Sequence, residues 1–197
     1  ARRSRAQIIA TDVHEPFLKI LRQRAEAEGL SDRIETRVAD MGDLPFDDRS
    51  FDLVWAEGCS FVIGFAEALK RWHRLPAPGA CLVLSEFTWF RENPPKELIE
   101  FVFGDSGEDG SLPARRLAIR EAGYELLREL PLPKEAWWNS YYVPLIDRLR
   151  EFEERHAGIE SAAEVAAHVR QELDLYRRYP EHFGYTFFVL KPLPKCK

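Results

Sequence analysis

The N-terminal half of the chain alternates between short apolar runs and amphipathic stretches. Short apolar runs predict strands over residues 7–11, 51–56 and 81–85, and an alternating pattern predicts another over 33–39. Apolar residues at helical spacing predict a helix after the first strand and another after the third. Strand, helix and strand in this order are typical of parallel βαβ units. The pattern therefore predicts an α/β fold with a doubly wound, mostly parallel sheet.

The C-terminal half has a looser pattern. Ser111 is a candidate cap for a helix, and a strand is expected over residues 124–130. Residues 134–180 carry apolar positions at helical spacing, and a last apolar strand follows over 185–190. We therefore expect a single domain over residues 1–197, with residues 134–180 forming a helical insertion that serves as a lid.

Composition and charge exclude several classes of protein. The chain has 197 residues and a net charge of −5, and 45 % of its residues are hydrophobic, too many for a disordered chain. No apolar run approaches the ~18 residues of a membrane span, and no signal-peptide pattern is present. The mild acidity argues against nucleic acid as a partner. Cys59, Cys81 and Cys196 are far apart, so we expect neither a disulfide scaffold nor a metal site, and a reducing cytoplasmic location.

Each of the four predicted strands is followed by an acid: Asp12, Asp40, Glu57 and Glu86. Ligands of open parallel sheets bind outside the carboxyl ends of the strands. A carboxylate there accepts hydrogen bonds from a ribose diol or an adenine amine. An acid after a strand also caps the next helix, but four at one edge favour a ligand-binding rim. Nicotinamide enzymes use a similar carboxylate, so the rim alone does not decide the cofactor.

Four segments identify a resemblance: ATDVHEPFL, VADMGDLPF, FDLVWAEG and LPAPGACLVLSE. They resemble the successive motifs of class I S-adenosylmethionine-dependent methyltransferases. WAEGCSFVIGF, SEFTWF, AGYELL and GYTFFVLKP are similar to uncharacterised bacterial members grouped with the ubiquinone/menaquinone-biosynthesis type. The resemblance implies a Rossmann-like sheet with helices on both faces, a final antiparallel strand beside the fourth, and methyl transfer from S-adenosyl-L-methionine to a small-molecule acceptor.

The resemblance also implies a role for particular residues in cofactor binding. It assigns Asp12 to the ribose hydroxyls, Val13 to the adenine, Asp40 to the adenine amine, Ala39 and Met41 to the ring faces, and Glu57 and Gly58 to the methionine end.

One family motif has no counterpart in the sequence. The family's first strand carries a glycine-rich turn, E/D-x-G-x-G-x-G, and nothing like it precedes Gln7. Because that strand is central in the family sheet, we expect the native protein to have roughly 40 or more further N-terminal residues, one strand-plus-helix unit with its lead-in. Without them we expect weak cofactor binding or none.

The catalytic residues are less defined than the cofactor residues. Methyl transfer from a sulfonium depends chiefly on proximity and orientation, and it needs a general base only if the nucleophile must lose a proton. Candidate bases near the predicted edge are Glu57, His14 and Glu86. The alternative, which the sequence favours for His14, is an exposed residue at a helix start; for Glu86 the alternative is a buried acid.

Aromatic residues mark the candidate substrate site. Trp137, Trp138, Tyr141 and Tyr142 lie on one side of a predicted helix, where the family often builds a substrate cover. Phe61 and Trp89 are expected to line the same space. Core packing of the inserted helix explains the same pattern.

Three hypotheses follow from the sequence. The first is a methyltransferase that uses S-adenosyl-L-methionine; the alternatives are a nicotinamide-dependent oxidoreductase on a Rossmann sheet and a non-catalytic methyltransferase-like binding module. The expected partner is a small-molecule acceptor, without nucleic acid or membrane insertion, and the long inserted helices are compatible with a homodimer.

Overall fold

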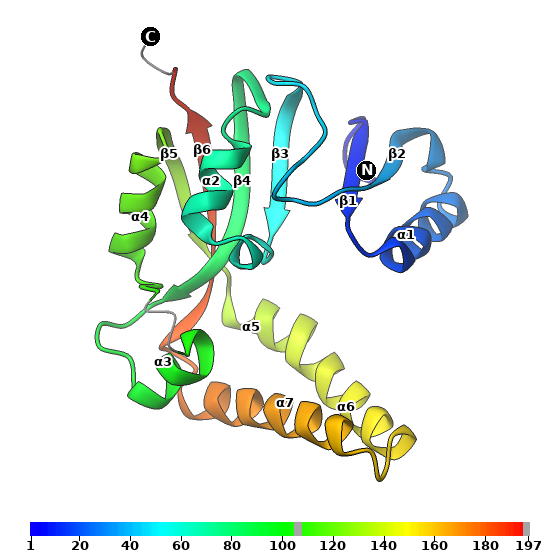
Figure 1. Cartoon of the computed structure of the whole chain (residues 1–197), viewed down its shortest axis with the longest axis vertical. Coiled ribbons are helices and arrows are strands. Elements are labelled where there is room, and N and C mark those ends of the chain that lie inside the picture. The colour runs from blue at the N-terminus through cyan, green and yellow to red at the C-terminus, as the bar shows by residue number, and fades with distance from the viewer. Residues whose placement is uncertain (105–107, 195–197) are drawn as a thin grey trace.

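The computed structural model describes residues 1–104 and 108–194, in which six strands form two separate sheets (Figure 1). The smaller sheet pairs β1 (Ile8–Asp12) with β2 (Ile34–Val38) in parallel. The larger sheet has the order β3-β4-β6-β5. Its strands are β3 (Phe51–Glu57), β4 (Pro76–Trp89), β5 (Tyr124–Pro131) and β6 (Phe183–Pro192). Between β1 and β3 there is a gap, and both strands run in the same direction along it.

The pairing confirms the predicted fold class. β3 and β4 pair in parallel, whereas β6 pairs antiparallel with both β4 and β5. The last strand therefore lies beside the fourth, as the resemblance implied. β4 is much longer than the predicted strand over residues 81–85, because β6 pairs with it from Leu82 to Trp89. This extension places Glu86 inside the strand rather than after it.

Helices and short turns surround the two sheets. The α-helices are α1 (Glu15–Ala27), α2 (Phe65–Trp72), α3 (Lys96–Phe103), α4 (Leu112–Glu121), α5 (Lys134–Trp137), α6 (Val143–Arg155) and α7 (Glu160–Arg178). The 3-10 turns are η1 (Ser31–Arg33) and η2 (Ser60–Val62), and η3 (Trp138–Tyr142) is a π-helical turn. No helix in the described part of the chain combines the length and apolarity of a membrane span.

Local sequence explains where α4 begins and ends. The Ser111 hydroxyl accepts a hydrogen bond from Ala114 N at 3.3 Å, which satisfies one donor of the first turn. Pro113 fits there because that position needs no N–H donor. Gly123 follows the helix with φ +83°, a left-handed conformation that glycine adopts without strain.

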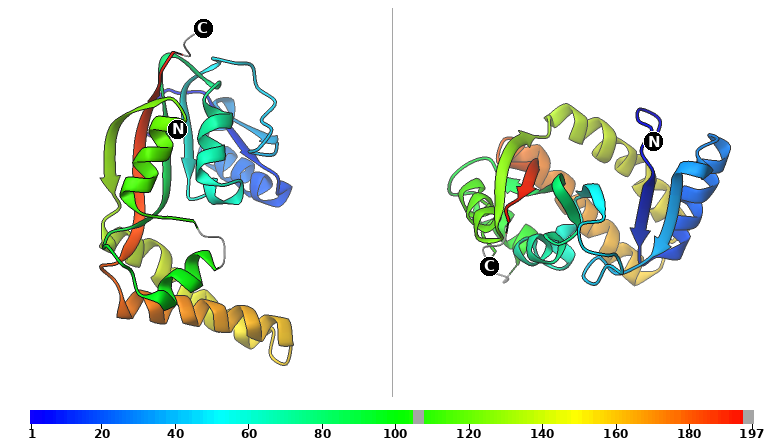
Figure 2. Two further views of the ribbon diagram at one scale, coloured as in Figure 1. Left: turned by 60° about the vertical axis from the view of Figure 1, so that its left-hand side comes forward. Right: turned by 90° about the horizontal axis from the view of Figure 1, so that it is seen from above.

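Two hydrophobic cores hold the structure together. The first lies where α2 and α4 cover one face of the larger sheet (Figure 2), with Leu69, Leu84 and Phe188 at its centre. The second joins α3 and the inserted helices to the far ends of β4 and β6, around Tyr142 and Phe183. The segment α5–η3–α6 and the returning helix α7 form a hairpin beyond the end of the sheet (Figure 1).

The loop over residues 39–50 connects the two sheets and is held against α2. Trp72 Nε1 donates to Met41 O at 2.9 Å, and Arg71 Nη1 donates to Gly42 O at 2.6 Å. Arg74 Nη2 donates to Leu44 O at 2.6 Å. These hydrogen bonds attach the segment that follows β2 to the helix that covers the larger sheet.

Candidate functional site

A hollow of about 520 Å³ lies between β1 and β3, within the size range of small-molecule sites. Asp12 from β1, Asp40 from the loop after β2 and Glu57 from β3 all line it. The structure thus brings together three of the four acids that follow the predicted strands. Their carboxyl-end position follows from the parallel direction of the strands.

The two aspartates share one geometry. Asp12 Oδ1 accepts a hydrogen bond from His14 N at 2.7 Å, and Asp40 Oδ1 accepts one from Gly42 N at 2.7 Å. Each bond fixes one carboxylate oxygen and leaves the second without a hydrogen bond among the described residues. Two oriented oxygens therefore remain available to donors on a ligand.

The predicted neighbours of these aspartates also border the hollow. Val13, Ala39 and Met41 line it, and Val13 is 66 % exposed, open to contact with a ligand. Glu57 accepts a hydrogen bond from Trp55 Nε1 at 2.6 Å on the exposed side of β3. Gly58 lies just outside, with φ +54°. No basic residue of the described chain lines the hollow, so it suits a ligand rich in donors or positive charge.

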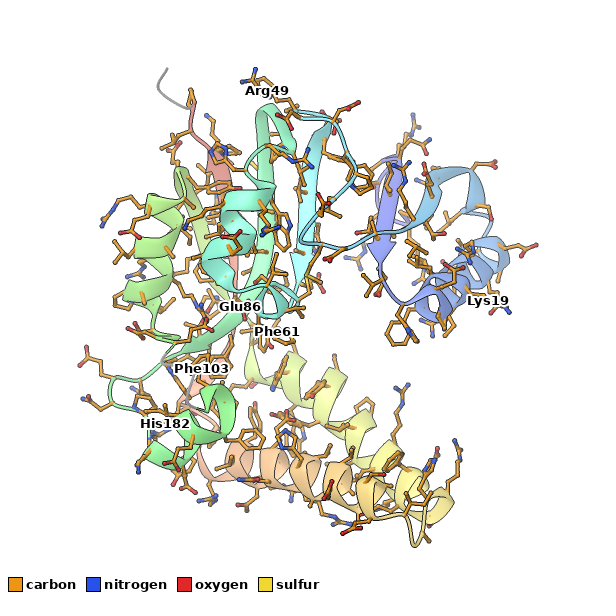
Figure 3. The ribbon with its side chains drawn as sticks, in the orientation of Figure 1. Lys19, Arg49, Phe61, Glu86, Phe103 and His182 are labelled. Carbon is orange, nitrogen blue, oxygen red and sulfur yellow. The ribbon has the colours of Figure 1, made fainter. Side chains whose placement is uncertain are left out.

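Two candidate bases lie away from the hollow. Glu86 is 2 % exposed and accepts hydrogen bonds from the Ser60 hydroxyl and from Phe87 N at 2.9 Å. The predicted rim position of Glu86 is therefore wrong, because β4 continues past it and the side chain is buried behind η2 (Figure 3). His14 is exposed at the start of α1 and contacts Phe17 edge-on. A catalytic role for either residue stays a prediction.

The aromatic residues predicted to form the substrate site occupy different places. Trp89 is buried against Phe103 and Phe183, and Trp138 stacks on Tyr176 at 5.9 Å, so both contribute to packing. Phe61 is 61 % exposed on η2, near the end of the larger sheet (Figure 3). Trp137 and Tyr141 stack on each other at 4.8 Å between the inserted helices and the sheet.

Three further residues near the site carry no sequence motif. Cys59 lines the hollow, and burial together with the nearby Glu86 carboxylate raises the pKa of its thiol. Tyr185 on β6 stacks on Trp137 at 4.8 Å. Glu172 on α7 accepts a hydrogen bond from the Tyr142 hydroxyl at 3.2 Å. The sequence does not indicate Tyr185, because a tyrosine in the apolar run YTFFVL is typical of a hydrophobic core. It does not indicate Glu172 either, because an acid on an amphipathic helix is typical of the solvent-exposed face.

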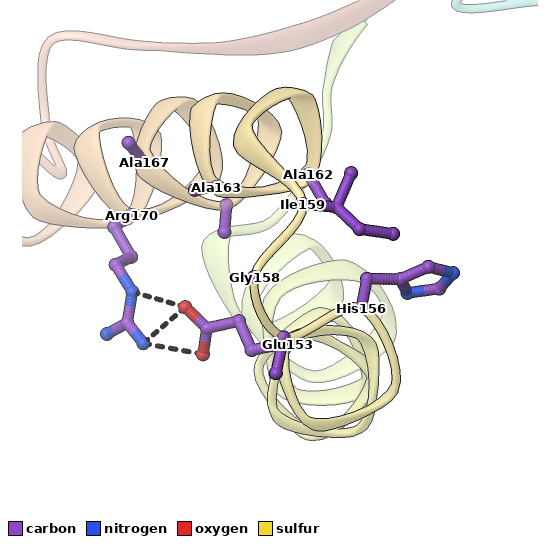
Figure 4. A pocket seen from close by; sticks show the side chains of 10 residues that line it. Glu153, His156, Gly158, Ile159, Ala162, Ala163, Ala167 and Arg170 are labelled. Atoms are coloured by element: carbon purple, nitrogen blue, oxygen red, sulfur yellow. Dashed lines mark hydrogen bonds and ion pairs between the residues drawn. The ribbon is translucent and has the colours of Figure 1, made fainter.

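Metal and ligand sites elsewhere are limited. The described residues contain no group of three or more His, Cys, Asp or Glu side chains placed to hold a metal ion. A second hollow of about 250 Å³ lies at the tip of the α6–α7 hairpin (Figure 4). There Arg170 Nη2 pairs with Glu153 Oε2 at 2.6 Å, and His156, Ile159 and small residues form the rest of the wall. Its charges are already paired, so it offers little to a ligand.

Comparison with known sequences shows which proteins the chain resembles. Residues 1–84 match the model of the methyltransferase domain family. The chain is 37 % identical over 99 residues to a demethylmenaquinone methyltransferase of Thermus thermophilus, covering 50 % of this chain and 42 % of that protein. It is 38 % identical over 84 residues to the ubiquinone/menaquinone biosynthesis C-methyltransferase UbiE of Dinoroseobacter shibae, covering 42 % of this chain and 34 % of that one. The chain thus spans less than half the length of these relatives.

Comparison with solved structures supports the same fold. An S-adenosylmethionine-dependent methyltransferase of Thiobacillus denitrificans, solved with S-adenosyl-L-homocysteine, superposes with a TM-score of 0.81 at 20 % identity. The match covers 98 % of this chain and 78 % of that one. The resemblance indicated by the sequence motifs is confirmed: the chain has the Rossmann-like fold of class I methyltransferases. In sequence it resembles the methyltransferases of ubiquinone and menaquinone biosynthesis.

Proposed function

We propose that this chain belongs to an S-adenosyl-L-methionine-dependent methyltransferase that acts on a small-molecule acceptor. The observation that carries the proposal is the pair of aspartates, Asp12 and Asp40, which present fixed carboxylate oxygens to one hollow. Asp12 binds the ribose hydroxyls and Asp40 the adenine amine, while Val13, Ala39 and Met41 contact the adenine. Glu57 and Gly58 border the methionine end.

The chemistry requires little more than correct placement. The sulfonium carries its own leaving group, so alignment of the acceptor with the methyl group supplies much of the acceleration. The three acids of the hollow favour the positively charged cofactor over its neutral demethylated product. This charge difference helps to release the product after transfer.

A test of the proposal compares three ligands by isothermal titration calorimetry with the full-length protein. S-adenosyl-L-methionine and S-adenosyl-L-homocysteine are expected to bind at one site, and NADH is expected not to bind. Binding of NADH alone would favour the oxidoreductase hypothesis. Binding of none of the three would favour the non-catalytic module.

The acceptor is a reduced quinone or a related hydroxylated aromatic ring. Support comes from the names of the relatives, which act on demethylmenaquinone or in ubiquinone and menaquinone biosynthesis. The aromatic side chains of Trp137, Tyr141 and Tyr185 provide an apolar environment for such a ring. Transfer of a labelled methyl group to 1,4-dihydroxynaphthalene under reducing conditions tests this class. A cytoplasmic location, a homodimer and the absence of nucleic-acid partners stay predictions.

A further parallel strand completes the sheet in the functional protein. β1 and β3 run in the same direction on either side of the gap, and within the described residues each has a partner on one side only. Leu53 and Trp55 of β3, on the sheet face opposite α2, are 49 % and 56 % exposed, an unusual exposure for apolar strand residues, and a helix attached to the further strand would cover them. One strand at the usual spacing of about 4.8 Å from each neighbour would pair both edges. It would fill the part of the hollow between Ile9 and Val54, and the part beside Asp12, Asp40 and Glu57, at the carboxyl ends of the strands, would remain for the cofactor.

The strand proposal has its own test. A longer native chain that includes the glycine-rich turn is expected to bind S-adenosyl-L-homocysteine more tightly than residues 1–197 alone. Equal affinity of the two proteins would contradict the proposal.

A further inference from the structure

Three aromatic rings connect the helical insertion to the sheet, and we call them the ring stack. Trp137 lies between Tyr185 and Tyr141, with ring centroids 4.8 Å apart on each side and interplanar angles of 24° and 29°. Tyr185 belongs to β6, whereas the other two rings come from α5 and η3. Both faces of the indole are therefore covered, and the stack holds the Tyr185 ring in one orientation.

The π-helical turn explains how the insertion supplies these contacts. An α-helix brings residues i and i+4 together, but the wider η3 turn also places Tyr142, at i+5, against Trp137 at 5.9 Å. The Tyr142 hydroxyl then reaches Glu172 on α7. The side chain of Glu172 also faces Tyr141, and burial together with this carboxylate raises the pKa of Tyr141 to about 12. Glu172 thus anchors the segment that carries the ring stack.

The other end of the stack lies beside the cofactor hollow. A Cβ atom on Gly58 would be 3.3 Å from Tyr185 Cε1 and 3.9 Å from its hydroxyl oxygen. Gly58 directly follows Glu57, which lines the hollow. A glycine is needed here for two reasons, because φ is +54° and because the tyrosine ring approaches so closely.

The Tyr185 hydroxyl is free to bind a ligand. It has no hydrogen-bond partner among the described residues, and it is not one of the fully enclosed polar atoms. Burial, with the Glu86, Tyr141 and Glu172 groups nearby, raises the pKa of Tyr185 to about 12. The phenol is therefore neutral near pH 7, when it donates a hydrogen bond rather than acting as a base.

We propose that the Tyr185 hydroxyl donates a hydrogen bond to an oxygen atom of the methyl acceptor, and that Trp137 and Glu172 are positioning residues for it. The proposal rests on the methyltransferase function given above. The Tyr185 ring lies next to Gly58, which follows Glu57 of the hollow, and the proposed function assigns the methionine end of the cofactor to these two residues. An acceptor must approach the transferred methyl group there. A hydroxylated aromatic ring offers the required oxygen.

The first part of the test removes the hydroxyl alone. Tyr185→Phe keeps the ring stack, and Tyr179→Phe is a matched control, because that hydroxyl bonds Glu97 on an exposed surface. With 1,4-dihydroxynaphthalene as acceptor, kcat/KM of Tyr185→Phe is expected to fall about three- to ten-fold. The Kd of S-adenosyl-L-homocysteine should be unchanged in both variants. An unchanged kcat/KM, or an equal loss in Tyr179→Phe, would overturn the proposal.

The second part tests positioning by conservative rescue. Glu172→Leu cannot accept the Tyr142 hydrogen bond and is expected to lower kcat/KM, whereas Glu172→Gln retains an acceptor oxygen and is expected to restore it. Equal losses in both variants would contradict a positioning role.

A binding measurement separates this inference from the proposed function. Failure of the full-length native protein to bind S-adenosyl-L-homocysteine would refute the methyltransferase function itself. In a crystal of the loaded protein soaked with 1,4-dihydroxynaphthalene, an acceptor oxygen should lie within hydrogen-bond distance of Tyr185. Acceptor density elsewhere, or no binding of this probe, would refute the inference while the cofactor function stands.

Discussion

The substitution Asp12→Asn removes the charge from the carboxylate proposed to bind the ribose while keeping its shape. Asp12 Oδ1 already accepts a hydrogen bond from His14 N at 2.7 Å, and the amide oxygen of asparagine can keep that bond. The amide NH₂ group would then occupy the position of the second oxygen. There it would meet the ribose hydroxyls as a donor and not as an acceptor.

The magnitude follows from the loss of a charge-assisted hydrogen bond. Such bonds contribute about 1.5–3 kcal/mol, which corresponds to a rise in the Kd of S-adenosyl-L-methionine of about 10- to 150-fold. Asp52→Asn is the matched control, because Asp52 is exposed on β3 and does not line the hollow. Its Kd should stay within about two-fold of the native value.

Isothermal titration calorimetry with the full-length protein measures both values, and circular dichroism checks that each variant is folded. A change of less than about two-fold for Asp12→Asn would refute the role of Asp12. A comparable loss for Asp52→Asn would show that general charge, rather than a specific contact, governs binding.

Three further predictions concern stability. Leu69→Ala empties part of the core under α2 and should lower the free energy of unfolding by about 2–5 kcal/mol in urea titrations; a loss below about 1 kcal/mol would contradict the assigned packing. Ser60→Ala removes a donor from the buried Glu86 carboxylate and should cost about 1–3 kcal/mol in the same assay, and no change would argue that another donor replaces it. Burial raises the pKa of Glu172 above its ordinary 4.5, so the free energy of unfolding should fall as pH rises through the raised value. Thermal melts from about pH 4 to about pH 8 should show a weaker fall in Glu172→Gln, and identical slopes would contradict this.

Much of the fold is encoded in local pattern. The strands β1 and β3 are short apolar runs that end at an acid, β2 is a short alternating segment, and the sequence predicts each within a few positions. The convergence of Asp12, Asp40 and Glu57 follows from strand direction alone, since parallel strands present their carboxyl ends at one edge. Sequence reasoning therefore locates the candidate cofactor site with little information about packing.

The acceptor side of the site depends on distant contacts. Trp137 meets Tyr185, and Tyr142 meets Glu172, only because α7 and β6 return the chain to the sheet. No spacing within either segment indicates these pairs. The same reason explains the error at Glu86, whose burial results from the pairing of β4 with β6.

The arrangement of the loop over residues 39–50 has a mechanical consequence. It is the covalent link between the two sheets, and three of its carbonyl groups accept hydrogen bonds from α2 and from Arg74, which follows α2. A ligand that contacts Asp12 and Asp40 on one side and Glu57 on the other would span both parts and resist their separation. Binding should therefore slow amide exchange most strongly in β1 and β2, the smaller of the two parts, because the bound ligand links them to the larger sheet.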